Sequence, residues 1–422
     1  MSLAPERSAT WHLVCSGCQR TESPHSQAGM CHACGSPFLV EHDLEQAVRY
    51  FEAAGRKPTD PIRCMLDLWP VLPLEYPSRS ASLYEGGTPL YPLDSRQGGA
   101  GGLWVKDESR NPTGSFKARG MFVALNRLRE LGIRRVVIPS AGNAAAAAAA
   151  YAAALGTECC VIVPEGTPPA NVLECLRYGA RVVQVKGSIH EAALLARKLR
   201  AMVGSFDLTT LREPYRLEGK KTMGYELFVQ CQELFGRPAP DFVLYPTGGG
   251  TGLIGIWKAY QEMRQLNWFN GSPPRLVAVQ AEGCAPIVRA FREGAVRARR
   301  WENPQTIASG LRVPGPAGDR LMLRAIRETE GTAISVSDPA ILSARRELAR
   351  QGHDVCPEAA ACWAAYHELL RCGFLQRNDL VVLLNTATGL KYNHLDELPN
   401  LETLDPEDVD WDDLDRTILR EH

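Results

Sequence analysis

The chain is predicted to be an α/β protein with doubly wound parallel sheets and a small metal-binding segment at its N-terminus. Three observations carry this prediction. Short apolar runs alternate with helix-like stretches, small or turn-forming residues follow those runs, and two paired cysteine motifs lie within the first 42 residues. The chain has 422 residues, more than one hydrophobic core usually organises, so we expect two main domains with appendages.

The first 42 residues contain the motif Cys15-x2-Cys18-x12-Cys31-x2-Cys34. Two such pairs offer four thiolates to one tetrahedral ion, and a site closed by four cysteines leaves no position for water. The motif therefore predicts a structural zinc ribbon, against the alternative of four unrelated buried thiols. The nearby His12, His25 and His32 are expected to be surface residues.

Segments of different composition flank the central part of the chain, and the C-terminal one is expected to carry no chemistry. Residues 43 to about 66 begin with a helix-like pattern, and the proline-rich stretch 68–80 is expected to be irregular. The tail after Tyr392 is acidic and is expected to be solvated.

Six apolar, β-branched runs lie between these ends, at 134–140, 158–164, 180–185, 241–246, 275–280 and 379–384. Nearly continuous apolar runs are typical of parallel strands that are buried on both faces. Residues 191–203 and 251–263 are helix-like, and seven alanines, Ala144 to Ala150, predict a further helix. Ligands of such folds bind beyond the carboxyl ends of the strands, so the loops there are the candidate site.

The strongest chemical signal is the segment VKDESRNPTGSFKARG, residues 105–120. A single lysine is usually a solvated surface charge. Lys117, however, has small or apolar neighbours, which can desolvate its ammonium group and lower its pKa. A neutral amine of this kind is what Schiff-base chemistry requires.

Two further turns follow predicted strands. The segment YPTGGGTGL, residues 245–253, predicts a phosphate-binding loop in which backbone N–H groups of Gly248, Gly249, Gly250, Thr251 and Gly252 face an anion at a helix N-terminus. The segment PSAGNA, residues 139–144, places Asn143 before the alanine run. By itself this position predicts a helix cap.

Segments 82–90 (SLYEGGTPL) and 111–120 (NPTGSFKARG) resemble motifs of the fold-type II enzymes that use pyridoxal 5′-phosphate (PLP), the family of the tryptophan synthase β-subunit. Within that family the chain most resembles the threonine synthases, from Leu13 to Tyr392. The resemblance implies that Lys117 holds PLP as a Schiff base, that the glycine loop binds its phosphate, and that Asn143 contacts its ring hydroxyl.

In LLNTATGLKY, residues 383–392, the resemblance places the Thr386 hydroxyl against the pyridine nitrogen. A hydroxyl leaves that nitrogen largely unprotonated and favours elimination or replacement chemistry. Here Ala387 replaces the glycine of the family pattern.

The chain departs from the family pattern around the expected substrate phosphate. Ala118 stands where aspartate is usual, Ala141 and Ala144 stand where threonine is usual, and TTLREPYR lacks the Asn-Ser that often precedes this arginine. The residues that remain as candidate phosphate ligands are Arg119, Ser140 and Arg216. Losing several polar contacts would weaken binding unless other residues replace them.

The predicted layout is a zinc ribbon (1–42), a large PLP-binding α/β domain (43–118 and 215–400), a small α/β domain (119–214) and an acidic tail (401–422). The resemblance implies a threonine synthase, which converts O-phospho-L-homoserine and water to L-threonine and phosphate. The alternatives are a related lyase or β-replacement enzyme (threonine or serine ammonia-lyase, cysteate synthase-like) and, less favoured, a non-catalytic protein that binds PLP and zinc.

The composition of the chain excludes some classes of binding partner. The chain is 45% hydrophobic and 23% charged, with a formal net charge of −1. It lacks the basic surface that nucleic acid or an anionic membrane attracts, so neither is an expected partner. The resemblance implies a small, phosphorylated amino-acid substrate. No run approaches a membrane span of about 18 apolar residues, and the N-terminus has no signal-peptide pattern. A cytoplasmic location is therefore expected, and the family resemblance implies a homodimer.

Overall fold

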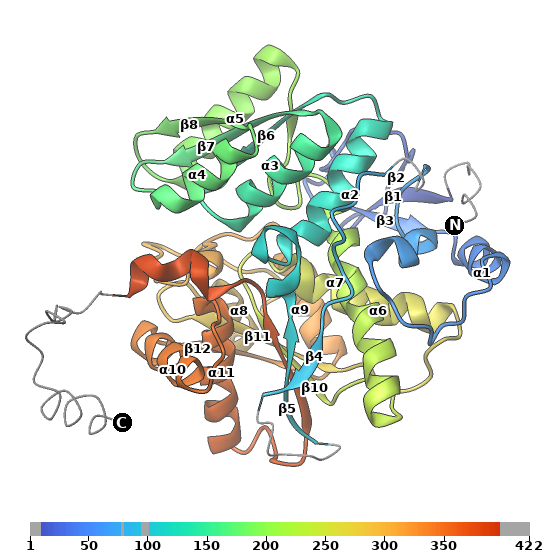
Figure 1. The fold of residues 1–422 in the computed structure, drawn as a ribbon, viewed down its shortest axis with the longest axis vertical. Helices are drawn as coiled ribbons and strands as arrows, with labels where there is room; N and C mark the ends of the chain where they lie inside the picture. Colours follow the sequence, from blue (N-terminus) through green and yellow to red (C-terminus); the bar gives the residue numbers. More distant parts are fainter. Residues whose placement is uncertain (1–9, 77–79, 94–100, 397–422) are drawn as a thin grey trace, which may run out of the picture.

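The computed structural model describes residues 10–76, 80–93 and 101–396, and it contains three sheets (Figure 1). The predicted acidic tail, 401–422, lies outside the described residues, as do residues 1–9. Within the described ranges, no helix is both long and apolar enough to cross a membrane.

The N-terminal sheet is small and antiparallel, with the order β2-β1-β3. Its strands are β1 (Trp11–Cys15), β2 (Thr21–Glu22) and β3 (Phe38–His42). Helix α1 (Leu44–Ala53) follows, and the Asp43 side chain caps it by accepting from the Gln46 backbone N–H at 3.0 Å. The helix ends at Ala53, close to the end of the helix-like sequence 43–54, and Gly55 follows it with a positive φ of 66°.

The stretch that was expected to be irregular contains a 3₁₀ helix, Met65–Val71, with Pro70 inside it. The prediction is therefore wrong for residues 68–71, whereas residues 72–76 lie in no helix or strand. This short helix packs against the rest of the protein, because Leu68 and Val71 are buried in the main core.

The large sheet has the order β12-β11-β10-β13-β5-β4, and only the edge strand β4 runs antiparallel to its neighbour. Its strands are β4 (Leu90–Pro92), β5 (Gly102–Asp107), β10 (Phe242–Pro246), β11 (Arg275–Ala281), β12 (Thr332–Val336) and β13 (Leu380–Asn385). The helices of this half are α6 (Tyr215–Phe235), α7 (Thr251–Gln265), α8 (Pro286–Arg292), α9 (Asp319–Glu328), α10 (Asp338–Arg350) and α11 (Pro357–Arg371).

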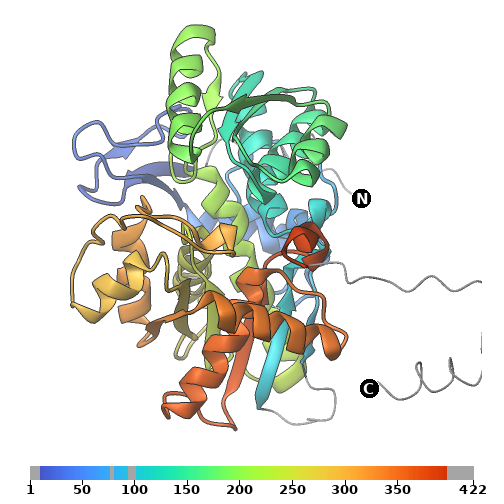
Figure 2. The same ribbon diagram turned by 90° about the vertical axis from the view of Figure 1, so that its left-hand side faces the viewer.

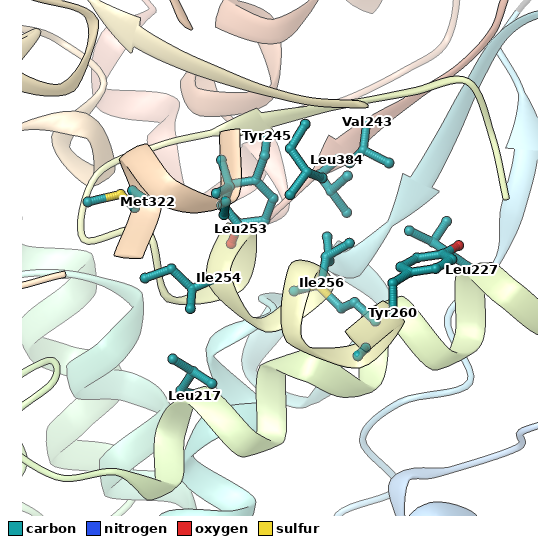
Figure 3. Close-up of a cluster of buried hydrophobic side chains, with 14 of the residues drawn as sticks. Leu217, Leu227, Val243, Tyr245, Leu253, Ile254, Ile256, Tyr260, Met322 and Leu384 are labelled. Carbon is teal, nitrogen blue, oxygen red and sulfur yellow. The ribbon is translucent and has the colours of Figure 1, made fainter. Parts of the chain in front are cut away.

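The main core of this half lies where strands β10 and β13 face helices α6 and α7. Figure 3 shows Val243 and Leu384 from the strands above Leu253 and Ile256 of α7, and all four are buried. Helix α6 is buried along most of its length, since it packs against both α7 and α2. Charged side chains on α6 therefore need partners inside the protein.

The small sheet is entirely parallel, with the order β8-β7-β6-β9, and forms the other half of the molecule (Figures 1 and 2). Its strands are β6 (Arg135–Pro139), β7 (Glu158–Pro164), β8 (Arg181–Val185) and β9 (Phe206–Asp207). Its helices are α2 (Lys117–Glu130), α3 (Asn143–Leu155), α4 (Pro169–Arg177) and α5 (Ile189–Val203). All six predicted strands are confirmed, and the alanine-rich helix α3 packs against α2.

Candidate active site

Lys117 is the first residue of α2, which lies at the junction of the two halves (Figure 1). A short turn, Pro112–Gly114, precedes it, and Gly114 has φ 60°. Two hydrogen bonds fix this segment to the end of β13, from Phe116 N–H to the Thr386 carbonyl (3.0 Å) and from Thr388 N–H to the Gly114 carbonyl (3.0 Å). The amine is thus held where a strand end and a helix start meet.

The Lys117 amine lies 4.3 Å from the centroid of the Phe116 ring. Burial of the charged form, and then the positive charge of Arg216, lower the pKa of Lys117 from 10.5 to about 8. A substantial fraction of this amine is therefore neutral near physiological pH, as the sequence predicted.

This pKa leads to a testable pH dependence. The rate of PLP uptake by the apo-protein should rise about tenfold between one pH unit below and one above the Lys117 pKa, because the neutral fraction rises in that proportion. It should then level off. Stopped-flow absorbance measures this rate. A rate that keeps rising past pH ~9, as for a free amine of ordinary pKa, would contradict the lowered pKa.

The glycine loop connects β10 to α7. In the described part of the chain, the backbone N–H groups of Gly248, Gly249 and Gly250 donate to no protein acceptor. Two of the glycines have no room for a side chain: an added Cβ at Gly248 would lie 2.1 Å from the Gly310 carbonyl oxygen, and at Gly250, where φ is 72°, it would lie 1.9 Å from Met322 Sδ. Free N–H groups at the N-terminus of α7 suit an anion.

Asn143 is not the helix cap that its position suggested. Gly142 occupies the N-cap of α3, without a side-chain bond, and Asn143 is the first helical residue. Its amide Nδ2 donates to the Tyr392 hydroxyl at 3.1 Å. The Asn143 side chain is therefore not used as a helix cap. Its hydrogen bond to Tyr392 connects the start of α3 to the turn after β13. Ser140 lies in the same turn, where its hydroxyl accepts from the Gly142 N–H at 3.4 Å.

Thr386 directly follows β13 and is buried. Its hydroxyl lies 3.5 Å from Cys356 Sγ, at the N-cap of α11. Burial raises the pKa of Cys356 to about 12, so this thiol is neutral and does not bring a negative charge to the hydroxyl.

Arg216, in the first turn of α6, is buried and donates from Nη1 to the Leu208 carbonyl at 2.7 Å. Its Nε has no hydrogen-bond partner among the described residues, and the nearest carboxylate, Glu213, is 3.8 Å away. Burial raises the pKa of Glu213 to about 7, so this neighbour neutralises Arg216 only in part. Arg216 can therefore bind a further anion through its Nε–H donor.

Arg119 cannot fill the role expected of it. It is fully buried, and Nε, Nη1 and Nη2 all donate to protein acceptors: the carboxylates of Glu108 and Glu226 and the hydroxyls of Thr88 and Thr222. A guanidinium has five N–H donors, and all five are engaged. The structure therefore gives Arg119 a structural role and leaves it no donor for a substrate phosphate.

Several polar residues near the site were not predicted. Lys220, Glu213 and Glu358 are buried, and Glu358 Oε2 and Ser115 Oγ have no hydrogen-bond partner in the described part of the chain. The doubled lysine in EGKKT is the one sequence signal that could have indicated Lys220.

These residues fit PLP. The free N–H groups of the loop match its phosphate, the Lys117 amine matches its aldehyde, and Asn143 and Thr386 offer polar groups for the ring. The partnerless Ser115 hydroxyl is a further polar group close to Lys117 in the chain. The donor set thus suits one molecule with an anionic end and a polar aromatic ring.

The four predicted zinc cysteines are brought together. Cys15 Sγ lies 3.3 Å from Cys34 Sγ, Cys18 Sγ lies 3.6 Å from Cys31 Sγ, and all four sulfurs lie within 4.8 Å of one another. Four thiolates at about 2.3 Å from one zinc ion would lie about 3.8 Å apart, so the cluster has the size of a tetrahedral site.

Comparison with known proteins agrees with this geometry. Residues 81–387 match the model of the family described as pyridoxal-phosphate dependent enzymes. The threonine synthases of Methanosarcina acetivorans and Methanocaldococcus jannaschii are each 38% identical to the chain, over 76% of it and 78% of their own length. Among solved structures, maize serine racemase has a TM-score of 0.62 at 22% identity and covers 73% of this chain and 90% of its own.

The chain therefore belongs to the family of pyridoxal-phosphate dependent enzymes, with the α/β parallel-sheet architecture of fold-type II. Within that family it is threonine synthase-like.

Proposed function

We propose that the chain is a PLP-dependent threonine synthase, which converts O-phospho-L-homoserine and water to L-threonine and phosphate. The observation that carries the proposal is the setting of Lys117. Its partly neutral amine follows a segment that is hydrogen-bonded to the end of β13 at Thr386, in a chain similar to known threonine synthases.

In this proposal each site residue has one role. Lys117 binds the cofactor covalently, and Gly248, Gly249, Gly250, Thr251 and Gly252 hold the cofactor phosphate. The Asn143 amide faces the ring hydroxyl, and the Thr386 hydroxyl faces the ring nitrogen. PLP, when bound, would supply an electron-withdrawing ring that stabilises negative charge on the substrate Cα.

The residues of the chain would do the rest of the chemistry. Lys117 moves protons between Cα, Cβ and Cγ of the substrate, and its pKa of about 8 suits an amine that must both accept and donate a proton. Phosphate leaves from Cγ, and water adds at Cβ. Arg216 binds the substrate phosphate, and the Ser140 hydroxyl is proposed as a second ligand.

A related lyase or β-replacement activity is the second candidate. Ala118, Ala141 and Ala144 favour it, since three positions where the family usually has polar side chains cannot hydrogen-bond a phosphate. Purified holoenzyme should be offered O-phosphohomoserine, O-phosphoserine, threonine and serine, with phosphate and ammonia measured separately. Phosphate released with threonine supports the first candidate. Ammonia from threonine without phosphate release supports the second.

The cysteine cluster is proposed to hold one structural zinc ion per chain. Cys15 and Cys31 are buried, whereas Cys18 and Cys34 are exposed, so the ion would lie near the surface of the small N-terminal sheet. The sheet packs against the core of the protein through β3 and α6. The ion would therefore stabilise the packing of this sheet against the rest of the protein.

Cys15→Ser or Cys31→Ser should lower the thermal unfolding temperature before it affects chemistry, because a closed thiolate site supports folding. Metal analysis should find about one zinc per wild-type chain. Cys160→Ser, at a half-buried thiol outside the cluster, is the matched control and should keep the zinc. A stable Cys15→Ser protein that keeps PLP but has lost turnover would refute the structural role.

The domain boundaries are also a proposal: 1–42, 43–118 with 215–400, 119–214, and 401–422. They are supported by the strands, since all four strands of the small sheet lie between Arg135 and Asp207. A homodimer and a cytoplasmic location stay predictions.

A further inference from the structure

Lys220, on α6, is a buried lysine without a carboxylate partner. It is 1% exposed, and its ammonium donates to the hydroxyl of Thr251, the first residue of α7, at 2.8 Å. The ammonium also lies 4.8 Å from the centroid of the Phe116 ring. In the described part of the chain Lys220 makes no ion pair.

Four other buried cations of the protein are paired with carboxylates. Lys221, the next residue, contacts Glu218 at 2.6 Å and Glu262 at 2.9 Å. Lys106, Arg119 and Arg127 likewise contact carboxylates. An unpaired buried ammonium is costly, so the difference between Lys220 and Lys221 requires an explanation.

The surroundings of Lys220 carry an excess of positive charge. Lys117 approaches the same Phe116 ring, and Arg216 lies four residues earlier on α6, hence on the same helix face. Burial first, and then the charges of Lys117 and Arg216, lower the pKa of Lys220 well below its ordinary value. The negative charge of Glu213 opposes this effect, but the pKa of Glu213 is itself raised to about 7.

This excess lies beside a site built for an anion. Thr251 follows the glycine loop directly, and the loop N–H groups have no protein acceptor in the described residues. We propose that Lys220 is a phosphate-binding residue, whose ammonium donates to a phosphate dianion at the N-terminus of α7 together with the loop N–H groups and the Thr251 hydroxyl.

The inference rests on the proposed function, because both the cofactor and the proposed substrate carry a phosphate. A dianion would supply the negative charge that the cluster of Lys117, Arg216 and Lys220 lacks.

The test uses Lys220→Met and Lys220→Gln, which remove the charge, and Lys220→Arg, which keeps it. The apo-proteins are titrated with PLP, and their thermal unfolding is measured with and without inorganic phosphate. KM for O-phosphohomoserine is measured on the holoenzymes. Lys221→Met is the matched control, because its charge is already neutralised by Glu218 and Glu262.

The charge-removing variants should raise either the Kd for PLP or the KM for O-phosphohomoserine by about tenfold or more. The first outcome assigns Lys220 to the cofactor phosphate, and the second, with PLP affinity unchanged, assigns it to the substrate phosphate. Phosphate should stabilise the wild type and Lys220→Arg but not Lys220→Met. Without phosphate, Lys220→Met should unfold no earlier than the wild type, whereas Lys221→Met should unfold earlier.

If the wild type binds PLP and phosphate, and Lys220→Met and Lys220→Gln bind both equally well with an unchanged KM, the inference alone is overturned. A wild type that binds neither PLP nor phosphate would overturn the proposed function together with it.

Discussion

Lys117→Ala should abolish covalent attachment of PLP and lower turnover by about 1,000-fold or more, because one amine both holds the cofactor and transfers protons. The variant should fold at least as well as the wild-type apo-protein. Burial of the Lys117 amine is unfavourable, as its lowered pKa indicates, and Lys117 makes no ion pair in the described part of the chain. Its removal therefore breaks no stabilising contact of that kind. Visible absorbance and steady-state kinetics measure the two losses.

Lys221→Met is the control here too, since it removes a neighbouring buried lysine that is paired with Glu218 and Glu262. It should bind PLP covalently wherever it folds. A Lys117→Ala protein with wild-type turnover would exclude Lys117 as the catalytic amine.

Arg216→Ala should raise KM for O-phosphohomoserine about tenfold or more, because a charged contact to a phosphate is worth roughly 1.5–3 kcal/mol. The guanidinium is buried and has one nitrogen without a hydrogen-bond partner among the described residues, so its donor is available to a ligand. Inorganic phosphate should compete with the substrate in the wild type and lose that effect in the variant. The effect on unphosphorylated substrates should be small.

Arg345→Ala is the matched control: Arg345 is a largely buried arginine on α10 that, unlike Arg216, makes a close ion pair, from Nη1 to Asp396 at 2.6 Å. Its removal should leave KM unchanged. Equal KM values for wild type and Arg216→Ala, in proteins of equal stability, would remove Arg216 from the phosphate site.

Much of the fold was predictable because buried parallel strands have a local signature. The six predicted strands are continuous apolar runs, and each is confirmed. Strand β5 was not predicted, since it contains a lysine. Lys106 is tolerated there because its ammonium meets Glu226 of α6 at 2.6 Å, a partner 120 residues later in the chain. No local pattern reveals such a pair.

The residues of the candidate site likewise fall into those with a local sequence signal and those whose role depends on distant contacts. The glycine loop and Lys117 stand out because small residues next to a lysine or a strand are local features. Arg119 was assigned wrongly, since its partners Glu108 and Glu226 are separated along the sequence and converge only in the fold. Lys220 was overlooked because lysines are usually exposed. The sequence alone does not show that α6 is buried along most of its length, with Lys220 and Lys221 both inside the protein.

The most direct test of the central claim is borohydride reduction of the holoenzyme, followed by peptide mapping. Reduction fixes the cofactor to whichever amine holds it. The account predicts one cofactor-modified residue, Lys117, and an unmodified Lys220. Modification of Lys220 instead, or no modified lysine in a protein saturated with PLP, would contradict it.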